Sequence, residues 1–221
     1  MTFSRVCGFS GIGFVIMIVL GNAVLVPAGL PLTGAAPREA AAFFGTQQGA
    51  VALSSALTPA AWVLATLFGA GAVAALWPVE RERGEAWSLV GFAGLILQNS
   101  AFAGVIALRL ALAEAAHDGS AVEALWALEE ALFTLNGTFL AVALTGLSIG
   151  GARAGLTPRW HAGLGLLSAA LNFASATLTP LVMEHGQLYG LVGLSGWLLW
   201  AAWLVGYGVI LIRHEPRPVT A

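Results

Sequence analysis

Residues Gly8–Ala28 read GFSGIGFVIMIVLGNAVLVPA and contain no charged side chain. A helix that crosses a bilayer needs about 20 mostly apolar residues, and only helices and closed barrels satisfy their backbone hydrogen bonds in hydrocarbon. Barrel strands are shorter and alternate between apolar and polar residues, which this stretch does not do. It therefore predicts a transmembrane helix.

Comparable apolar runs continue along the chain. Of its 221 residues, 58% are hydrophobic and 9% are charged, whereas a soluble domain carries about 25% charged residues. The predicted spans lie near Gly8–Ala28, Val51–Trp77, Trp87–Ala113, Leu125–Ile149, Trp160–Val182 and Tyr189–Ile212. The sequence thus predicts an all-α fold, a polytopic bundle of six transmembrane helices that forms one integral membrane domain over residues 1–221.

Arginine placement predicts the direction of the spans, because cytoplasmic loops carry an excess of basic residues. If the chain crosses six times, Arg38 and Arg109 lie toward one side and seven arginines lie on the other. The seven are Arg5, Arg81, Arg83, Arg153, Arg159, Arg213 and Arg217. Both termini are therefore expected in the cytoplasm, with the protein in the inner (plasma) membrane. The charged segment Glu80–Glu85 is expected to be a solvated loop.

Two segments near the amino terminus each have a second interpretation. Because Arg5 precedes an apolar run, the first span resembles a signal peptide, whose cleavage would leave five spans and an external amino terminus. The segment Pro37–Phe44 has proline and an acid in its first turn, which favours a short helix. This helix is expected on the outer membrane surface, either as a plain interfacial helix or as a lid over a cavity.

Amide side chains recur at similar depth on several predicted spans. Asn99, Asn136 and Asn172 lie near mid-bilayer, and Asn22 lies somewhat nearer the outside. Such groups either form one polar centre in the bundle or join helices by hydrogen bonds worth about 1 kcal/mol each. Ser175 shares a helix face with Asn172 and is expected to belong to the same polar wall.

Glu129 is the candidate for an acid inside the bundle. Asn136 follows it by seven residues and shares its helix face, with Phe133 between them, whereas Glu130 is turned about 100° away. One interpretation makes Glu129 a proton donor whose carboxyl group is desolvated. The other is a salt bridge to Arg109, which ends the third span at a similar height.

Aromatic residues repeat at three- and four-residue steps on the last span. Trp200 and Trp203 belong to this stripe, which either packs against neighbouring helices or lines a pocket whose ring faces stabilise a cation. Trp62 on the second span and Phe133 on the fourth would extend such a pocket.

Several classes of protein are disfavoured by residues that the sequence lacks. The single Cys7 cannot form an internal disulfide, no helix carries metal-ligand spacing, and a net charge of −2 argues against nucleic acid. Gly193–Gly196 resembles the nucleophile motif of rhomboid proteases, but no histidine follows it inside a span. Glu129-Glu130 resembles the acidic pair of CAAX-protease-like enzymes, yet the arginine that should follow is Thr134. Aspartate-rich prenyltransferase motifs and a retinal-binding lysine are absent.

The stretch Leu125–Asn136, continuing at Leu156–Trp160, resembles a pattern that recurs in small actinobacterial membrane proteins of unknown function. In size and topology the chain is also similar to bacterial membrane-bound terpene cyclases. That resemblance implies an intramembrane enzyme acting on a lipophilic small molecule, by proton-initiated isoprenoid cyclisation, without cofactor or metal.

On this hypothesis Glu129 is the acid, and the carboxyl and the substrate are oriented by polar side chains. The polar residues are Asn99, Asn136, Asn172 and Ser175, and the aromatic wall is formed by Trp62, Phe133, Trp200 and Trp203. The expected partners are the substrate and membrane lipid. Two alternatives stay open, a transporter or binding protein for a small solute and a non-catalytic assembly subunit.

Overall fold

The computed structural model describes residues 1–214, without the side chains of residues 119–120 and 185–188. All regular secondary structure in this part of the chain is helical. The helices are α1 (Phe3–Leu25), α2 (Pro37–Thr46), α3 (Gln48–Arg83), α4 (Trp87–Glu114), α5 (Gly119–Arg153), α6 (Arg159–Thr177) and α7 (Thr179–Arg213).

Five of these helices are long and apolar enough to cross a membrane. They are α1, α3, α4, residues Ala121–Arg153 of α5 and residues Tyr189–Arg213 of α7. The prediction of an all-α, multi-pass membrane protein is confirmed to this extent. α6 is shorter and has a charged first turn, so a sixth crossing stays a prediction.

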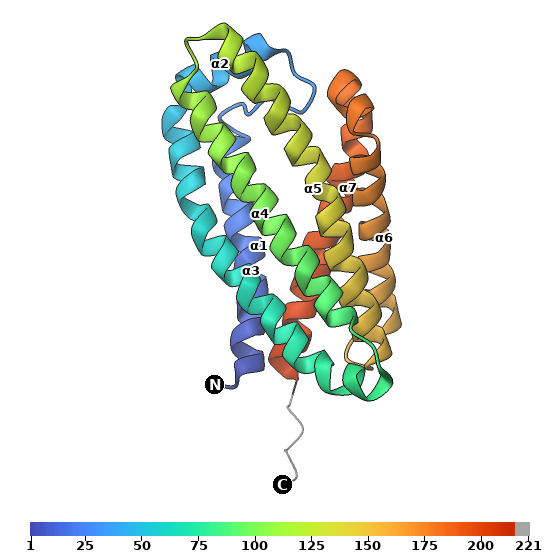
Figure 1. The fold of residues 1–221 in the computed structure, drawn as a ribbon. Helices are drawn as coiled ribbons and strands as arrows, with labels where there is room; N and C mark the ends of the chain where they lie inside the picture. The colour runs from blue at the N-terminus through green and yellow to red at the C-terminus, as the bar shows by residue number, and fades with distance from the viewer. Residues whose placement is uncertain (215–221) are drawn as a thin grey trace.

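Six helices form a closed ring in chain order, α1, α3, α4, α5, α6 and α7, and α7 packs back against α1 (Figure 1). The amino terminus and the end of α7 lie at the same end of the bundle, which we call the termini end. Glycines let the backbones approach closely. A Cβ at Gly94 of α4 would lie 2.9 Å from the Ala143 Cα of α5, and one at Gly8 of α1 would meet the Gly208 backbone of α7. Small residues at helix interfaces are typical of packing in membranes.

α2 crosses the opposite end of the bundle, which we call the α2 end (Figure 1). The short helix predicted at Pro37 is confirmed, and it extends to Thr46. Phe44 is fully buried against Trp126 of α5, with ring centroids 6.2 Å apart. The Trp126 indole Nε1 also donates a hydrogen bond to Ala35 O at 3.0 Å. α2 is therefore attached to the helix ends by its apolar face.

Two predicted loops are wrong because the helices continue through them. Glu80–Arg83 belongs to α3, which ends at Arg83 and is capped by Gly84 with a φ of 66°, a conformation that glycine adopts without strain. The gap predicted after Val182 lies within α7, which begins at Thr179. Pro180 explains that boundary, because proline lacks an N–H and is best tolerated in the first turn of a helix.

Candidate functional sites inside the bundle

Glu129 of α5 points into the bundle, where 2% of the residue is exposed. Its Oε1 accepts a hydrogen bond from Arg109 Nε of α4 at 2.7 Å. The Arg109 guanidinium in turn lies 5.7 Å from the ring centroid of Phe133. The salt bridge, one of the two interpretations from the sequence, is confirmed. It joins α4 to α5 near the α2 end.

The neighbouring carboxylate has a different partner. Glu130 is also buried, and its Oε1 accepts a hydrogen bond from the backbone N–H of Gly34. Gly34 lies in the connection between α1 and α2. Glu130 thus holds this connection against α5, a role that the sequence does not reveal because the partner is a backbone group in a distant segment.

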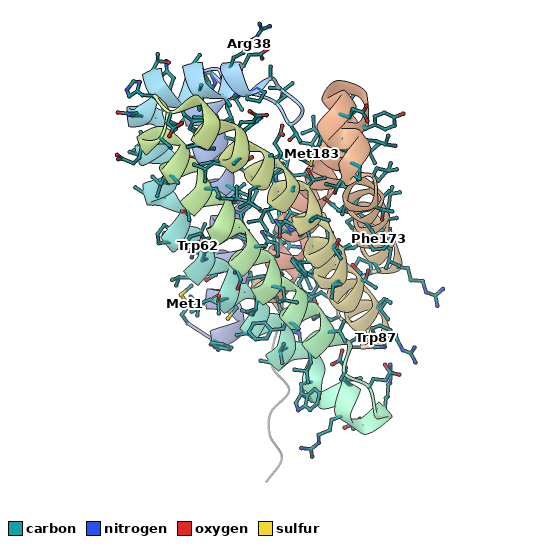
Figure 2. All side chains as sticks on the ribbon, turned by 45° about the horizontal axis from the view of Figure 1, so that its top comes forward. Met1, Arg38, Trp62, Trp87, Phe173 and Met183 are labelled. Atoms are coloured by element: carbon teal, nitrogen blue, oxygen red, sulfur yellow. The ribbon has the colours of Figure 1, made fainter. Side chains whose placement is uncertain are left out.

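A group of buried polar side-chain atoms lies about halfway along the bundle, and we call the residues that carry them the polar belt. The belt consists of the buried residues Gln98 and Asn99 of α4 and Asn136 of α5, and of Trp62 of α3, which is half-buried but has a buried Nε1. Figure 2 shows Trp62 between Arg38 at the α2 end and Trp87 at the termini end. Both polar atoms of Asn99, the Gln98 and Asn136 side-chain oxygens and the Trp62 Nε1 are buried without a hydrogen-bond partner among the described residues.

Helix register brings the belt residues to shared interfaces. On α3, Trp62 precedes Gly69 by seven residues, and on α4, Asn99 follows Phe92 by seven; a Cβ at Gly69 would lie 2.7 Å from the Phe92 ring. Residues seven apart share a helix face, so Trp62 and Asn99 both lie at the α3–α4 interface. By the same rule, Asn136 lies on the face of Ala143, which packs on α4.

The other two amides lie elsewhere. Asn172 Nδ2 donates to Ser168 O of its own helix at 2.9 Å, and a Cβ at Gly196 of α7 would lie 2.7 Å from that nitrogen. Ser175 faces α7 in the same way, because its Oγ lies next to Gly193. Asn22 bonds to Ile18 O of its own helix and is exposed. The structure therefore brings Asn99 and Asn136 to α4 interfaces and places Asn172 and Ser175 at the α6–α7 interface.

The four aromatic residues expected to form one wall lie in different parts of the molecule. Trp62 belongs to the polar belt, and Phe133 is 42% exposed beneath Arg109. Trp200 packs edge-on against Phe14 of α1, with centroids 5.5 Å apart. Trp203 packs against Phe68, His161 and Tyr207.

Two grooves run along the outside of the bundle. One of about 330 Å³ lies between the α2-end turns of α3 and α4 and includes Gln48 and Glu114. The other, of about 380 Å³, lies mainly between α5 and α6 and includes Thr138, Thr145 and Phe173. Neither groove includes Glu129 or a residue of the polar belt.

A second polar group lies at the termini end, and we call it the Glu80 cluster. Five helices and the α5–α6 connection contribute its buried residues: Glu80, Ser88, Ser148, Thr157, His161, Trp203 and Tyr207. Between it and the belt lies an apolar layer that includes Leu140, Leu144 and Leu147 of α5. The sequence does not reveal this cluster, and the prediction that Glu80 lies in a solvated loop is wrong, because the burial of Glu80 depends on the neighbouring helices.

Comparisons with protein families, with curated proteins and with solved structures give no match for this chain. Any assignment of function therefore rests on the chain's own residues.

Proposed function

We propose that this protein is a six-span membrane protein that binds a neutral lipophilic small molecule at the polar belt. The observation that carries the proposal is the set of partnerless atoms on Trp62, Gln98, Asn99 and Asn136 in the described part of the chain. A buried polar group without a partner costs about 1–3 kcal/mol. Such groups are expensive inside a membrane and usually mark a functional site. A ligand's polar group would supply the missing hydrogen bonds.

The chemistry of the belt defines the ligand class. Its partnerless donors are Asn99 Nδ2 and Trp62 Nε1, and its partnerless acceptors are the oxygens of Gln98, Asn99 and Asn136. A hydroxyl group both donates and accepts, whereas an anion only accepts and a metal cation needs acceptors alone. Trp62 is only partly buried, so the hydrocarbon tail of a ligand would extend from the belt into the surrounding lipid. An isoprenoid alcohol meets both requirements.

Binding fits the geometry better than proton-initiated cyclisation. A catalytic acid must hold a proton in position to donate it, and the acid form of Glu129 would give up its ion pair with Arg109. Binding also fits better than transport, because buried Leu140, Leu144 and Leu147 separate the belt from the termini end.

The sixth crossing and the cytoplasmic position of both termini belong to the same proposal. α6 packs between α5 and α7 and completes the ring. The Ser168 Oγ of α6 donates a hydrogen bond to Gly196 O of α7 at 2.7 Å, and Asn172 lies against the same glycine; both contacts would be lost if α6 lay outside the membrane. The arginines at the termini end follow the positive-inside rule.

Thermal unfolding of the purified protein in detergent tests the binding site. We expect geranylgeraniol to raise the Tm of the wild-type protein, and squalene, which has no hydroxyl group, to leave it unchanged. A ligand at 100 times its Kd stabilises by about 2.7 kcal/mol. Asn99→Leu should abolish the response, because it removes a donor and an acceptor from the belt.

Asn22→Leu is the matched control, since it removes an amide that is exposed and bonded within its own helix. This variant should keep the full response to geranylgeraniol. A wild-type protein that does not respond, or an Asn99→Leu variant that responds normally, would contradict the proposed site.

A further inference from the structure

Glu80 is a buried carboxylate without a basic partner among the described side chains. It is 2% exposed, and its Oε1 accepts a hydrogen bond from Ser88 N at 2.8 Å while Oε2 accepts one from Ser88 Oγ. The ion pairs found in the described part of the chain join Arg109 to Glu129 and Arg153 to Glu85. A buried charge is costly unless it is paired. A cation that is not part of the described chain would therefore stabilise the Glu80 carboxylate.

Side-chain oxygen atoms from three residues lie close to two adjacent glycines of α5. A Cβ at Gly150 would lie 2.6 Å from Glu80 Oε1, and one at Gly151 would lie 2.8 Å from Thr157 Oγ1 and 3.4 Å from the Tyr207 hydroxyl oxygen. Because glycine has no side chain, the oxygen atoms can approach the α5 backbone at Gly150 and Gly151. Since Gly150 and Gly151 are consecutive residues of α5, the Glu80 carboxylate and the two hydroxyl oxygens lie beside adjacent positions of one helix.

The two hydroxyl groups have no hydrogen-bond partner within residues 1–214. Tyr207 is completely buried and Thr157 nearly so. A buried hydroxyl without a partner is rare in folded proteins and indicates an unseen water or ion. Hydroxyl and carboxylate oxygens are the ligands that hard cations prefer.

Helix direction adds a favourable field for a cation. Glu80 lies in the last turn of α3, and Gly150 and Gly151 lie in the last turn of α5. Helix carboxyl ends carry a partial negative charge that stabilises cations. The single carboxylate suits one positive charge, because tight divalent sites use several acidic ligands. The described residues contain no cluster of three or more His, Cys, Asp or Glu side chains that could hold a metal ion in the usual way.

We propose that Glu80, Thr157 and Tyr207 form a binding site for a monovalent metal cation. The cation neutralises the Glu80 carboxylate and binds between this carboxylate and the two hydroxyl oxygens, beside Gly150 and Gly151. It joins the end of α3, the α5–α6 connection and α7, so its binding stabilises the folded bundle.

Unfolding in different chloride salts at equal ionic strength tests this site without any knowledge of the belt ligand. The purified protein is measured in NaCl, KCl and N-methyl-D-glucamine chloride, whose cation is too large to enter. We expect at least one of the metal salts to raise the Tm by about 5 °C over the organic salt. Equal Tm values in the three salts would overturn the proposal and leave water as the occupant.

Variants separate the site from general salt effects. Glu80→Gln keeps an oxygen for the Ser88 contacts but removes the charge, and it should abolish the cation response. Thr157→Val should weaken the response and provides a second test if Glu80→Gln does not fold. Glu85→Gln is the control, because it removes a nearby acid that already pairs with Arg153. A normal response in Thr157→Val, or loss of the response in Glu85→Gln, would contradict the assignment.

Discussion

Glu129 and Glu130 are adjacent acids with separate structural roles. Glu129 pairs with Arg109 across the α4–α5 interface, and Glu130 binds the backbone of the α1–α2 connection. The division follows from the rotation of about 100° per residue in an α-helix, which directs neighbouring side chains toward different elements. The sequence predicts that Glu129 faces inward together with Asn136, but it leaves two interpretations of the acid open, since pairing depends on where the Arg109 side chain ends.

Removing one partner of the Arg109–Glu129 ion pair should lower the free energy of unfolding more than removing both partners. Arg109→Leu leaves Glu129 buried without its partner, and such a loss costs about 3–5 kcal/mol. The double variant Arg109→Leu/Glu129→Leu removes both charges and should recover most of that stability. Thermal or denaturant unfolding in detergent measures the difference. A double variant as unstable as the single one would show that the side chains contribute by packing and not by charge.

At the scale of helices, close backbone approach decides where substitutions are tolerated. Gly94 of α4 lies against the backbone of Ala143, whereas at Gly163 of α6 an added Cβ would meet no other atom within 4 Å. The two glycines look alike in the sequence, because both lie in apolar helices. The two glycines differ only in how closely another helix packs against them.

Gly94→Ala should therefore lower the unfolding temperature and Gly163→Ala should not. A Cβ at Gly94 would force α4 and α5 apart, at a cost of about 1–3 kcal/mol for overpacking. Alanine at Gly163 should be neutral, or should stabilise by up to about 1 kcal/mol through helix propensity. Parallel unfolding curves of the two variants provide the measurement. Equal effects would refute the close approach of α4 and α5.

Helix positions are largely predictable from this sequence, and helix ends are less so. Trp87 and Pro37 begin helices as expected, because apolar periodicity and a first-turn proline are local signals. The continuation of α3 through Glu80 is not predictable, since charged residues usually mark a loop. Burial of Glu80 depends on α4 and α5, which are separate elements of the sequence. The place of Gln98 in the polar belt is not predictable for a related reason. A single amide in an apolar run does not indicate which neighbouring helix it faces.

At the scale of the whole molecule, the proposed six-span topology places the two ends of the helix ring on opposite sides of the membrane. Its termini end carries Glu82 and Arg159, and its α2 end carries Arg38; all three side chains are exposed. Thr177 is exposed at the far end of α6 from Arg159. These positions report the side of the membrane on which each helix end lies.

Cysteine labelling in intact cells tests this topology. In a Cys7→Ala background, Arg38→Cys and Thr177→Cys should react with a membrane-impermeant maleimide. Glu82→Cys and Arg159→Cys should react only after the membrane is permeabilised. Labelling of Arg159→Cys and Thr177→Cys on the same side would refute the sixth crossing, and the reverse pattern at Arg38 and Glu82 would reverse the orientation.

The apolar layer of Leu140, Leu144 and Leu147 has an electrical consequence. A voltage across the bilayer falls mainly where water and mobile charge are excluded, and it acts on a charge in proportion to the fraction of that drop which the charge traverses. In the proposed orientation, a cation that enters the Glu80 cluster from the cytoplasm stops before this insulating layer. Its occupancy would therefore follow the cytoplasmic salt concentration and change little when the membrane depolarises.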